Sequence, residues 1–191
     1  MRNKPDIVME DPSIRVVDAA PQGRMVDGVH VYPVRVYYED TDVGGVVYYA
    51  NYLKFAERAR SEMLRVIGFP HGEMMARDGL AFAVRRCEAD YIRPANFDDA
   101  LEVHTGNIDM EAAGLWLDQR VKRDGNDLVV LRVRLACVGQ NGKPARLPAV
   151  LRATLRDLKK SAIGAGSAAV GQEDGKENSG IVGESMVKER V

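Results

Sequence analysis

Three acidic residues and a pair of glycines occur together in the segment YYEDTDVGGVVYYANYLKFAERARSEML. The acids are Glu39, Asp40 and Asp42. A carboxylate in such a segment can take a proton from water or attack a carbonyl carbon directly. Gly44 and Gly45 follow, and glycine lets the main chain turn sharply and come close to a ligand. The stretch is therefore a candidate catalytic loop.

An apolar run, Val46, Val47, Tyr48 and Tyr49, leads from the glycines into a predicted helix. The first turn of a helix has main-chain N–H groups without acceptors and lies at the positive end of the helix dipole. Such N–H groups polarise a carbonyl oxygen and stabilise the negative charge that develops on it. A carboxylate and free amides would thus meet beside valine and tyrosine side chains, which suits the hydrolysis of an acyl group.

A thioester fits these groups better than an amide or an ester, because its thiolate leaving group is far less basic and needs no strong general acid. No Ser-His-Asp or Cys-His pairing occurs in the segment, which agrees with that chemistry. A purely structural interpretation is also open, since acids before helices are common as caps and Gly-Gly is common in turns. On spacing alone, the structural interpretation is the favoured one.

The composition excludes several other classes of protein. The 191-residue chain has 27 basic and 28 acidic residues, so its net charge of −1 creates no basic field that would attract nucleic acid. No apolar run approaches the ~20 residues of a membrane span, and charges or prolines interrupt each apolar stretch near the N-terminus. We therefore expect a cytoplasmic protein without a membrane span or secretory signal. Two cysteines and three scattered histidines predict neither a disulfide framework nor a metal site.

The two ends of the chain differ from its middle. Residues 1–27 contain three prolines and show no regular period, which predicts an irregular arm. Residues 161–191 are rich in small and polar residues and contain no aromatic residue, which predicts a disordered tail. The single working domain is therefore expected at residues 28–160.

Alternating and helical periods within that domain predict an α+β fold. A five-turn amphipathic helix is expected at residues 51–67, with Asn51 as its N-cap. Strands are expected at residues 29–38, 79–92, 101–105, 115–122 and 128–138, with a turn at Asp124-Gly125 and a short last helix from Pro148 to Leu158. One long helix can cover one face of a curved five-stranded antiparallel sheet. A homodimer that extends this sheet would pair its exposed edge.

The stretch DTDVGGVVYYANYLKFAERARSEML closely resembles the signature of the 4-hydroxybenzoyl-CoA thioesterase family, most of all its acyl-CoA thioesterase branch associated with the Tol-Pal cell-envelope system. The similarity continues through LAFAVRRCEADYIRPANFDDALEVHT to an RLP sequence and covers residues 30–158. It implies a hotdog fold that dimerises edge to edge and often forms tetramers. It also implies hydrolysis of an acyl-CoA, with acyl carrier protein as an alternative thiol, to a free acid without metal or cofactor.

The resemblance assigns roles to three residues of the candidate loop. Asp42 matches the catalytic carboxylate of the family, and the main-chain N–H near Tyr49 matches the group that polarises the thioester carbonyl. Tyr38 falls where this branch carries an active-site tyrosine. The Tol-Pal branch usually has histidine at the position of Tyr49. This difference argues against a step assisted by histidine, and the preference for particular acyl chains is not expected to carry over from that branch. Because the expected contact there is through the main chain, basic activity should survive.

Basic residues further along the chain are candidates for contacts with CoA. Arg85, Arg86 and Arg93 lie on one predicted strand and at its exit, and the resemblance implies that surface arginine and lysine bind the phosphates of CoA. We take Arg86 and Arg93 as substrate contacts, together with the loop residues Gly44 to Tyr48. Basic residues on a strand more often form only a solvated face, and that alternative stays open.

Two other functions are compatible with the same fold. A hotdog protein could bind acyl groups or an envelope-associated partner without turnover, but the acid and the Gly-Gly pair argue against it. A hotdog dehydratase pairs an acid with a histidine in the corresponding loop, whereas no histidine lies between His30 and His71. A steady-state assay of thiol release on a panel of acyl-CoAs would separate an enzyme from a pure binder.

Overall fold

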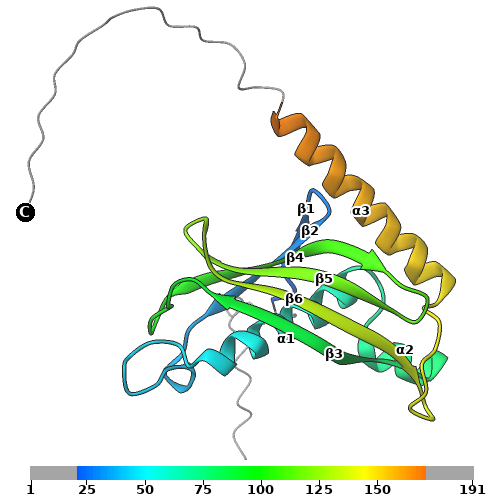
Figure 1. Ribbon diagram of the computed structural model, residues 1–191, viewed down its shortest axis with the longest axis horizontal. Helices are drawn as coiled ribbons and strands as arrows, with labels where there is room; N and C mark the ends of the chain where they lie inside the picture. The colour runs from blue at the N-terminus through cyan, green and yellow to red at the C-terminus, as the bar shows by residue number, and fades with distance from the viewer. Residues whose placement is uncertain (1–20, 171–191) are drawn as a thin grey trace, which may run out of the picture.

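A curved antiparallel sheet packed on one long helix forms the body of the protein in the computed structural model, which describes residues 21–170 (Figure 1). The sheet has six strands in the order β1-β2-β4-β5-β6-β3, and all neighbours pair antiparallel. The strands are β1 (Arg24–Val26), β2 (Val29–Arg35), β3 (Leu80–Tyr91), β4 (Ala100–Met110), β5 (Gly114–Arg123) and β6 (Asn126–Gly139). This arrangement confirms the predicted α+β hotdog fold, but with a sixth, short strand.

The long helix α1 (Tyr49–Val66) covers the inner face of the sheet because one of its sides is almost entirely apolar. Its buried residues include Tyr52, Phe55, Ala56, Ala59 and Met63, which recur at the three- and four-residue spacing of a helical stripe. The facing strands contribute alternate apolar residues, as a half-buried strand does. The main apolar core therefore lies between α1 and the central strands.

A buried polar group ties α1 to the sheet at one defined position. The Gln119 side-chain amide on β5 donates to the Ala56 carbonyl on α1 and to the Thr105 hydroxyl on β4, both at 2.9 Å. Its carbonyl oxygen accepts a hydrogen bond of 2.7 Å from Arg60. Buried amides are costly unless all their hydrogen bonds are made, so this network fixes how α1 sits on the sheet.

Three further helices complete the described residues. A 3-10 turn, η1 (Tyr38–Asp40), follows β2, and α2 (His71–Asp78) lies between α1 and β3. The last helix, α3 (Ala149–Val170), packs against β4 and rises from the sheet on the side away from α1 (Figure 1). Within residues 21–170, no helix is long and apolar enough to cross a membrane.

Several predicted boundaries differ from the observed ones. β1 lies in the segment predicted as an irregular arm, and the first long strand ends at Arg35 rather than residue 38. α1 begins at Tyr49, so Asn51 is inside the helix and is not its N-cap. The sequence does not predict α2, and α3 continues to Val170, ten residues beyond the predicted end of the domain. The rest of the predicted arm and tail, residues 1–20 and 171–191, lies outside the described residues.

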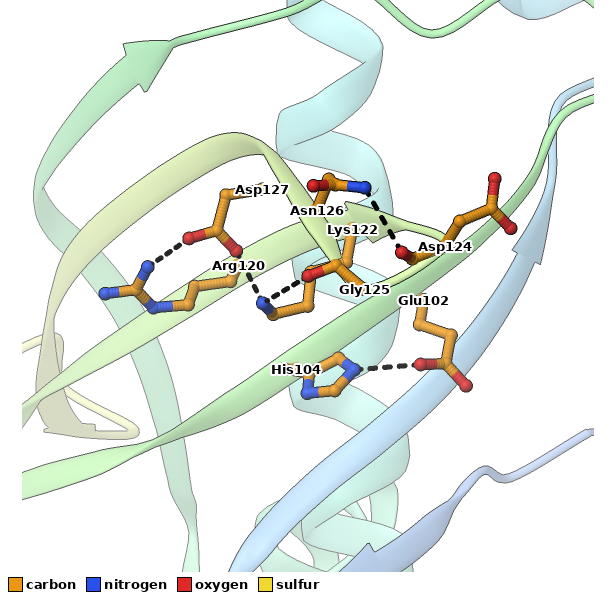
Figure 2. A network of polar contacts seen from close by, with 8 residues as sticks. All are labelled: Glu102, His104, Arg120, Lys122, Asp124, Gly125, Asn126 and Asp127. Atoms are coloured by element: carbon orange, nitrogen blue, oxygen red, sulfur yellow. Dashed lines mark hydrogen bonds and ion pairs between the residues drawn. The ribbon is translucent and has the colours of Figure 1, made fainter. Parts of the chain in front are cut away.

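The predicted turn at Asp124-Gly125 joins β5 to β6, and both residues have the positive φ angles, 51° and 78°, of a type I′ hairpin. Figure 2 shows the polar residues around it on the sheet. Lys122 donates to the Gly125 carbonyl at 3.2 Å and pairs with Asp127, which also pairs with Arg120. The hydrogen bond from Lys122 is the main reason why the pKa of Asp127 is lowered. This face is a paired, solvated polar surface.

We predict that Gly28→Ala destabilises the protein by about 1–3 kcal/mol, because the added carbon would overlap the main chain of α3. Gly28 has φ +76°, and a Cβ there would lie 2.7 Å from the Ala162 nitrogen. Gly125→Ala is the matched control, since Gly125 has φ +78° and a Cβ there would have no atom within 4 Å. Urea unfolding of both variants measures the difference. Equal losses would show that only the backbone conformation matters.

Candidate active site

A tight turn stabilised by its own main chain forms the candidate loop. Thr41 and Val47 make an isolated antiparallel bridge, and inside it the Asp42 N–H donates to the Val46 carbonyl at 3.0 Å. The Gly45 N–H closes the turn on the Asp42 carbonyl, also at 3.0 Å. The two arms of the turn are thus in register, with Asp42 on one arm and the lead-in to α1 on the other.

Each of the two glycines has a physical reason for its place. Gly45 has φ +75°, a conformation that side chains with a Cβ rarely adopt. At Gly44, a Cβ would lie 3.1 Å from the Oδ1 atom of Asp42 and would crowd the carboxylate. The pair therefore makes the sharp turn that the sequence predicts, and the close approach of its main chain to a ligand stays a prediction.

Asp40 holds this turn against the start of α1. Its carbonyl oxygen accepts two hydrogen bonds, from the Tyr48 N–H at 2.9 Å and from the Asn51 side-chain amide at 2.8 Å. Its carboxylate accepts from the Tyr37 N–H at 2.9 Å and is buried, with 5% of the residue exposed. The carbonyl and the carboxylate of Asp40 are therefore both used in hydrogen bonds that hold the loop together, and Asp40 differs in this from the other acids of the loop.

Asp42 is in the opposite situation. Its carboxylate accepts a hydrogen bond from the Gly44 N–H at 2.8 Å, and no other residue in the described part of the chain pairs with it. The residue is exposed, as is Val43 beside it, whereas Val47 is buried. In the single chain, Asp42 therefore does not lie in the apolar surroundings of Val46 and Val47 that the sequence predicts, and it contacts the amide of its own turn rather than the first turn of α1.

The first turn of α1 provides the free N–H groups that the sequence predicts. The N–H of Tyr48 is bonded to Asp40 and that of Asn51 to the Tyr48 carbonyl at 2.8 Å. Between them, the N–H groups of Tyr49 and Ala50 have no acceptor among residues 21–170. These two donors lie at the positive end of an 18-residue helix and can bind a carbonyl oxygen.

A hollow of about 280 Å³ opens beside this helix start. It is lined by Val47, Tyr49, Tyr52, Tyr91, Ile92, Arg93 and Pro94. The Tyr91 ring lies edge-on to those of Tyr49 and Tyr52, with centroid distances of 6.3 and 6.0 Å. Burial raises the pKa of both Tyr52 and Tyr91, so their hydroxyls are neutral at physiological pH. The hollow is thus mainly aromatic and apolar, with one guanidinium at its border.

The other predicted site residues lie at varying distances from this centre. Arg93 borders the hollow, and the Tyr48 ring lies tilted by 52° against the Tyr49 ring, with centroids 4.6 Å apart. Tyr38 is exposed on η1, where its ring packs edge-on against Phe97. Arg86 is exposed on β3 and forms an ion pair of 2.7 Å with Glu88. Neither Tyr38 nor Arg86 lines the hollow.

Tyr91 lines the hollow, but the sequence analysis does not single it out, because its position predicts only that it belongs to a strand. Its hydroxyl donates to the Tyr49 carbonyl at 3.3 Å across 42 residues of sequence. The one signal that points to it is an aromatic residue at the end of a strand, three residues before Pro94. Tyr52 is predicted on the apolar side of the helix, and it is there, but it also lines the hollow.

Comparisons with known proteins agree with this geometry. A family model described as the thioesterase-like superfamily matches residues 36–155. The acyl-CoA thioesterase YbgC of Haemophilus influenzae is 41% identical over 136 residues, which are 71% of this chain and all of that protein. The acyl-CoA thioester hydrolase YbgC of Escherichia coli is 45% identical over 119 residues, covering 61% of this chain and 88% of that one.

Among solved structures, a probable thioesterase from Bartonella henselae is similar, with a TM-score of 0.60 and 40% identity, over 63% of this chain and 99% of that chain. The region that the family model matches includes the whole candidate loop, α1 and the sheet from β3 to β6. Because the family model spans more than half of the sequence and the Haemophilus protein is matched along its full length, this chain belongs to the thioesterase-like superfamily as a YbgC-like member with the hotdog fold.

Proposed function

We propose that the protein hydrolyses an acyl-CoA thioester to a free carboxylic acid and CoA. The observation that carries the proposal is the pair of free N–H groups at Tyr49 and Ala50, beside an aromatic hollow and on the same braced turn as Asp42. The names of the Haemophilus and Escherichia relatives support the same reaction.

In this proposal, the thioester carbonyl oxygen accepts hydrogen bonds from the N–H groups at the start of α1. These donors stabilise the negative charge that forms on the oxygen when the carbonyl carbon is attacked. Asp42 either takes a proton from the attacking water or attacks the carbon itself to give a mixed anhydride that water then opens. The C–S bond breaks, and CoA leaves as the thiolate, which needs no strong general acid.

The two arginines that the sequence predicts as contacts for the phosphates of CoA are not equally good candidates. Arg93 borders the hollow and has no ion-pair partner among residues 21–170, so it is available to a phosphate. Arg86 is already paired with Glu88, which makes it the weaker of the two candidates. An acyl carrier protein carries the same phosphopantetheine thiol, and it is the alternative donor of the acyl group.

A homodimer is part of the proposal. β3 pairs with β6 on one side only, and residues 83–91 of this twelve-residue edge strand are all exposed. Long open edges are normally paired or covered, and a second copy of β3 would satisfy this one. Two such dimers would form the homotetramer that the resemblance allows. The cytoplasmic location and the link to the Tol-Pal system stay predictions from the sequence.

The alternative, a protein that binds acyl groups without turnover, would share the hollow and the free amides. It would not need an unpaired carboxylate on the turn. The exposed Asp42, held only by the Gly44 amide, therefore favours the enzyme.

We predict that Asp42→Asn lowers kcat by about 10²–10⁴-fold, since the amide neither accepts a proton nor attacks a carbonyl. The melting temperature and the oligomeric state should not change, because Asp42 is exposed and can still accept the Gly44 hydrogen bond as asparagine. Glu39→Gln is the matched control: it removes an exposed carboxylate three residues away and should keep turnover. Release of the CoA thiol, measured with a disulfide reagent, gives the rates.

Two outcomes would contradict this role of Asp42. If Asp42→Asn unfolds, the acid is structural. If its rate equals that of Glu39→Gln, Asp42 is a bystander to the reaction.

Asp40→Ala should behave differently from Asp42→Asn. It removes a buried carboxylate and leaves the Tyr37 N–H without its acceptor, so we expect a loss of about 1–3 kcal/mol in the free energy of unfolding. Asp40→Asn keeps an acceptor oxygen and should lose less. Chemical unfolding followed by circular dichroism distinguishes the two variants, and equal stability of Asp40→Ala and the parent protein would refute the structural role.

The proposed dimer is tested by placing like charges on the open edge. Val84 is exposed on β3, and Val84→Asp should shift the protein towards monomer in sedimentation velocity. Val150→Asp adds the same charge to an exposed position on α3 and should leave the oligomeric state unchanged. A parent protein that sediments as a monomer at micromolar concentration would rule the dimer out.

A further inference from the structure

Asn51 is a buried polar residue in the first turn of α1, with 5% of the residue exposed. It is the third residue of the helix, and side chains of a helix lean back towards its start. The side-chain amide of Asn51 reaches beyond the helix and donates to the Asp40 carbonyl at 2.8 Å, across 11 residues of sequence. This contact joins the loop that carries the acids to the helix turn that carries the free N–H groups.

The free donors lie between two residues that are bonded to the same oxygen. The Tyr48 N–H, which precedes the donors, and the Asn51 side chain, which follows them, both donate to the Asp40 carbonyl. The N–H groups of Tyr49 and Ala50 are therefore fixed relative to this oxygen from both sides. A shift of the Asp40 carbonyl would change the position of the loop relative to the donors.

The position of the Asp42 carboxylate depends on the same oxygen. Asp42 follows Asp40 by two residues, and within residues 21–170 its carboxylate accepts a hydrogen bond only from the Gly44 N–H of its own turn. No bond of the carboxylate itself therefore fixes it against the start of α1. A displacement of about 1 Å between reacting groups can lower a rate by about 10²-fold, so the contact at Asp40 can control turnover from outside the reaction.

We propose that Asn51 is a positioning residue of the reaction, whose hydrogen bond to the Asp40 carbonyl keeps Asp42 in place relative to the N–H groups at the start of α1. The inference rests on the proposed thioester hydrolysis. The Tyr48 N–H makes a similar hydrogen bond, but any residue except proline provides a main-chain N–H at that position. The Asn51 side chain is thus the part of the contact that depends on residue type, and it can be removed by substitution.

The first test removes the amide with little change of shape. Asn51→Leu should lower kcat about 10- to 100-fold and change KM by less than about threefold, because substrate binding does not use the amide. Thr105→Val is the matched control, since it removes another buried hydrogen bond, of 2.9 Å to Gln119, in the network between α1 and the sheet. Both variants should lower the melting temperature, but Thr105→Val should keep the kcat of the parent protein.

A double variant tests whether Asn51 acts through Asp42. The residual rate of Asp42→Asn depends on the N–H donors, which belong to the helix itself. Adding Asn51→Leu to Asp42→Asn should therefore lower kcat by less than about threefold, whereas independent effects would multiply. Rates are measured on the full-length protein as thiol release from the best substrate among butyryl-CoA, benzoyl-CoA and palmitoyl-CoA.

The possible outcomes separate the two proposals. If Asn51→Leu keeps the kcat of Thr105→Val, or if its loss multiplies with that of Asp42→Asn, Asn51 does not position the acid, and thioester hydrolysis stands. Absence of thiol release by the parent protein from all three substrates would overturn both proposals. Should Asn51→Leu fail to fold, Asn51→Ser undergoes the same comparisons, since the serine side chain is too short to make the hydrogen bond to Asp40.

Discussion

Two hydrogen bonds to a single oxygen, the carbonyl of Asp40, determine how the candidate site is built. They come from the Tyr48 N–H and the Asn51 side chain, and they join the turn to the start of α1. Because the Tyr48 N–H is used in this way, the first free donors of the helix are those of Tyr49 and Ala50. The same two hydrogen bonds hold the arm of the turn that carries Asp42. The positions of the Asp42 carboxylate and of the free N–H groups therefore depend on one contact.

The position of β3 explains most of the remaining features. α1 covers the central strands, but the edge strand extends beyond it, and its residues Val84 and Tyr91 are exposed. The uncovered end of β3 next to the start of α1 forms the aromatic hollow, and its uncovered edge is the surface that we expect to pair with a second copy. The proposed substrate site and the proposed dimer surface thus have the same origin: one helix is too small to cover the whole sheet, and β3 is left uncovered.

The elements that the sequence predicted well are those with long apolar periods. α1 buries one side of a helix over five turns, and the central strands bury alternate residues along most of their length. β1 has three residues and α2 buries only Met74, so neither has enough positions to show a period. The start of α1 was misplaced because Asn51, a good cap in isolation, uses its amide to reach Asp40 instead.

The sequence alone determined the binary pattern of the fold and the presence of acids, glycines and a helix start in one short segment, since these depend on neighbouring residues. It did not distinguish Asp40 from Asp42, two acids in the same segment. Only the folded chain does so, because burial and the hydrogen bond with Tyr37 occupy one carboxylate, and the other is left exposed. It also brings Tyr91 to Tyr49 across 42 residues, a contact that depends on strand order and on no local pattern.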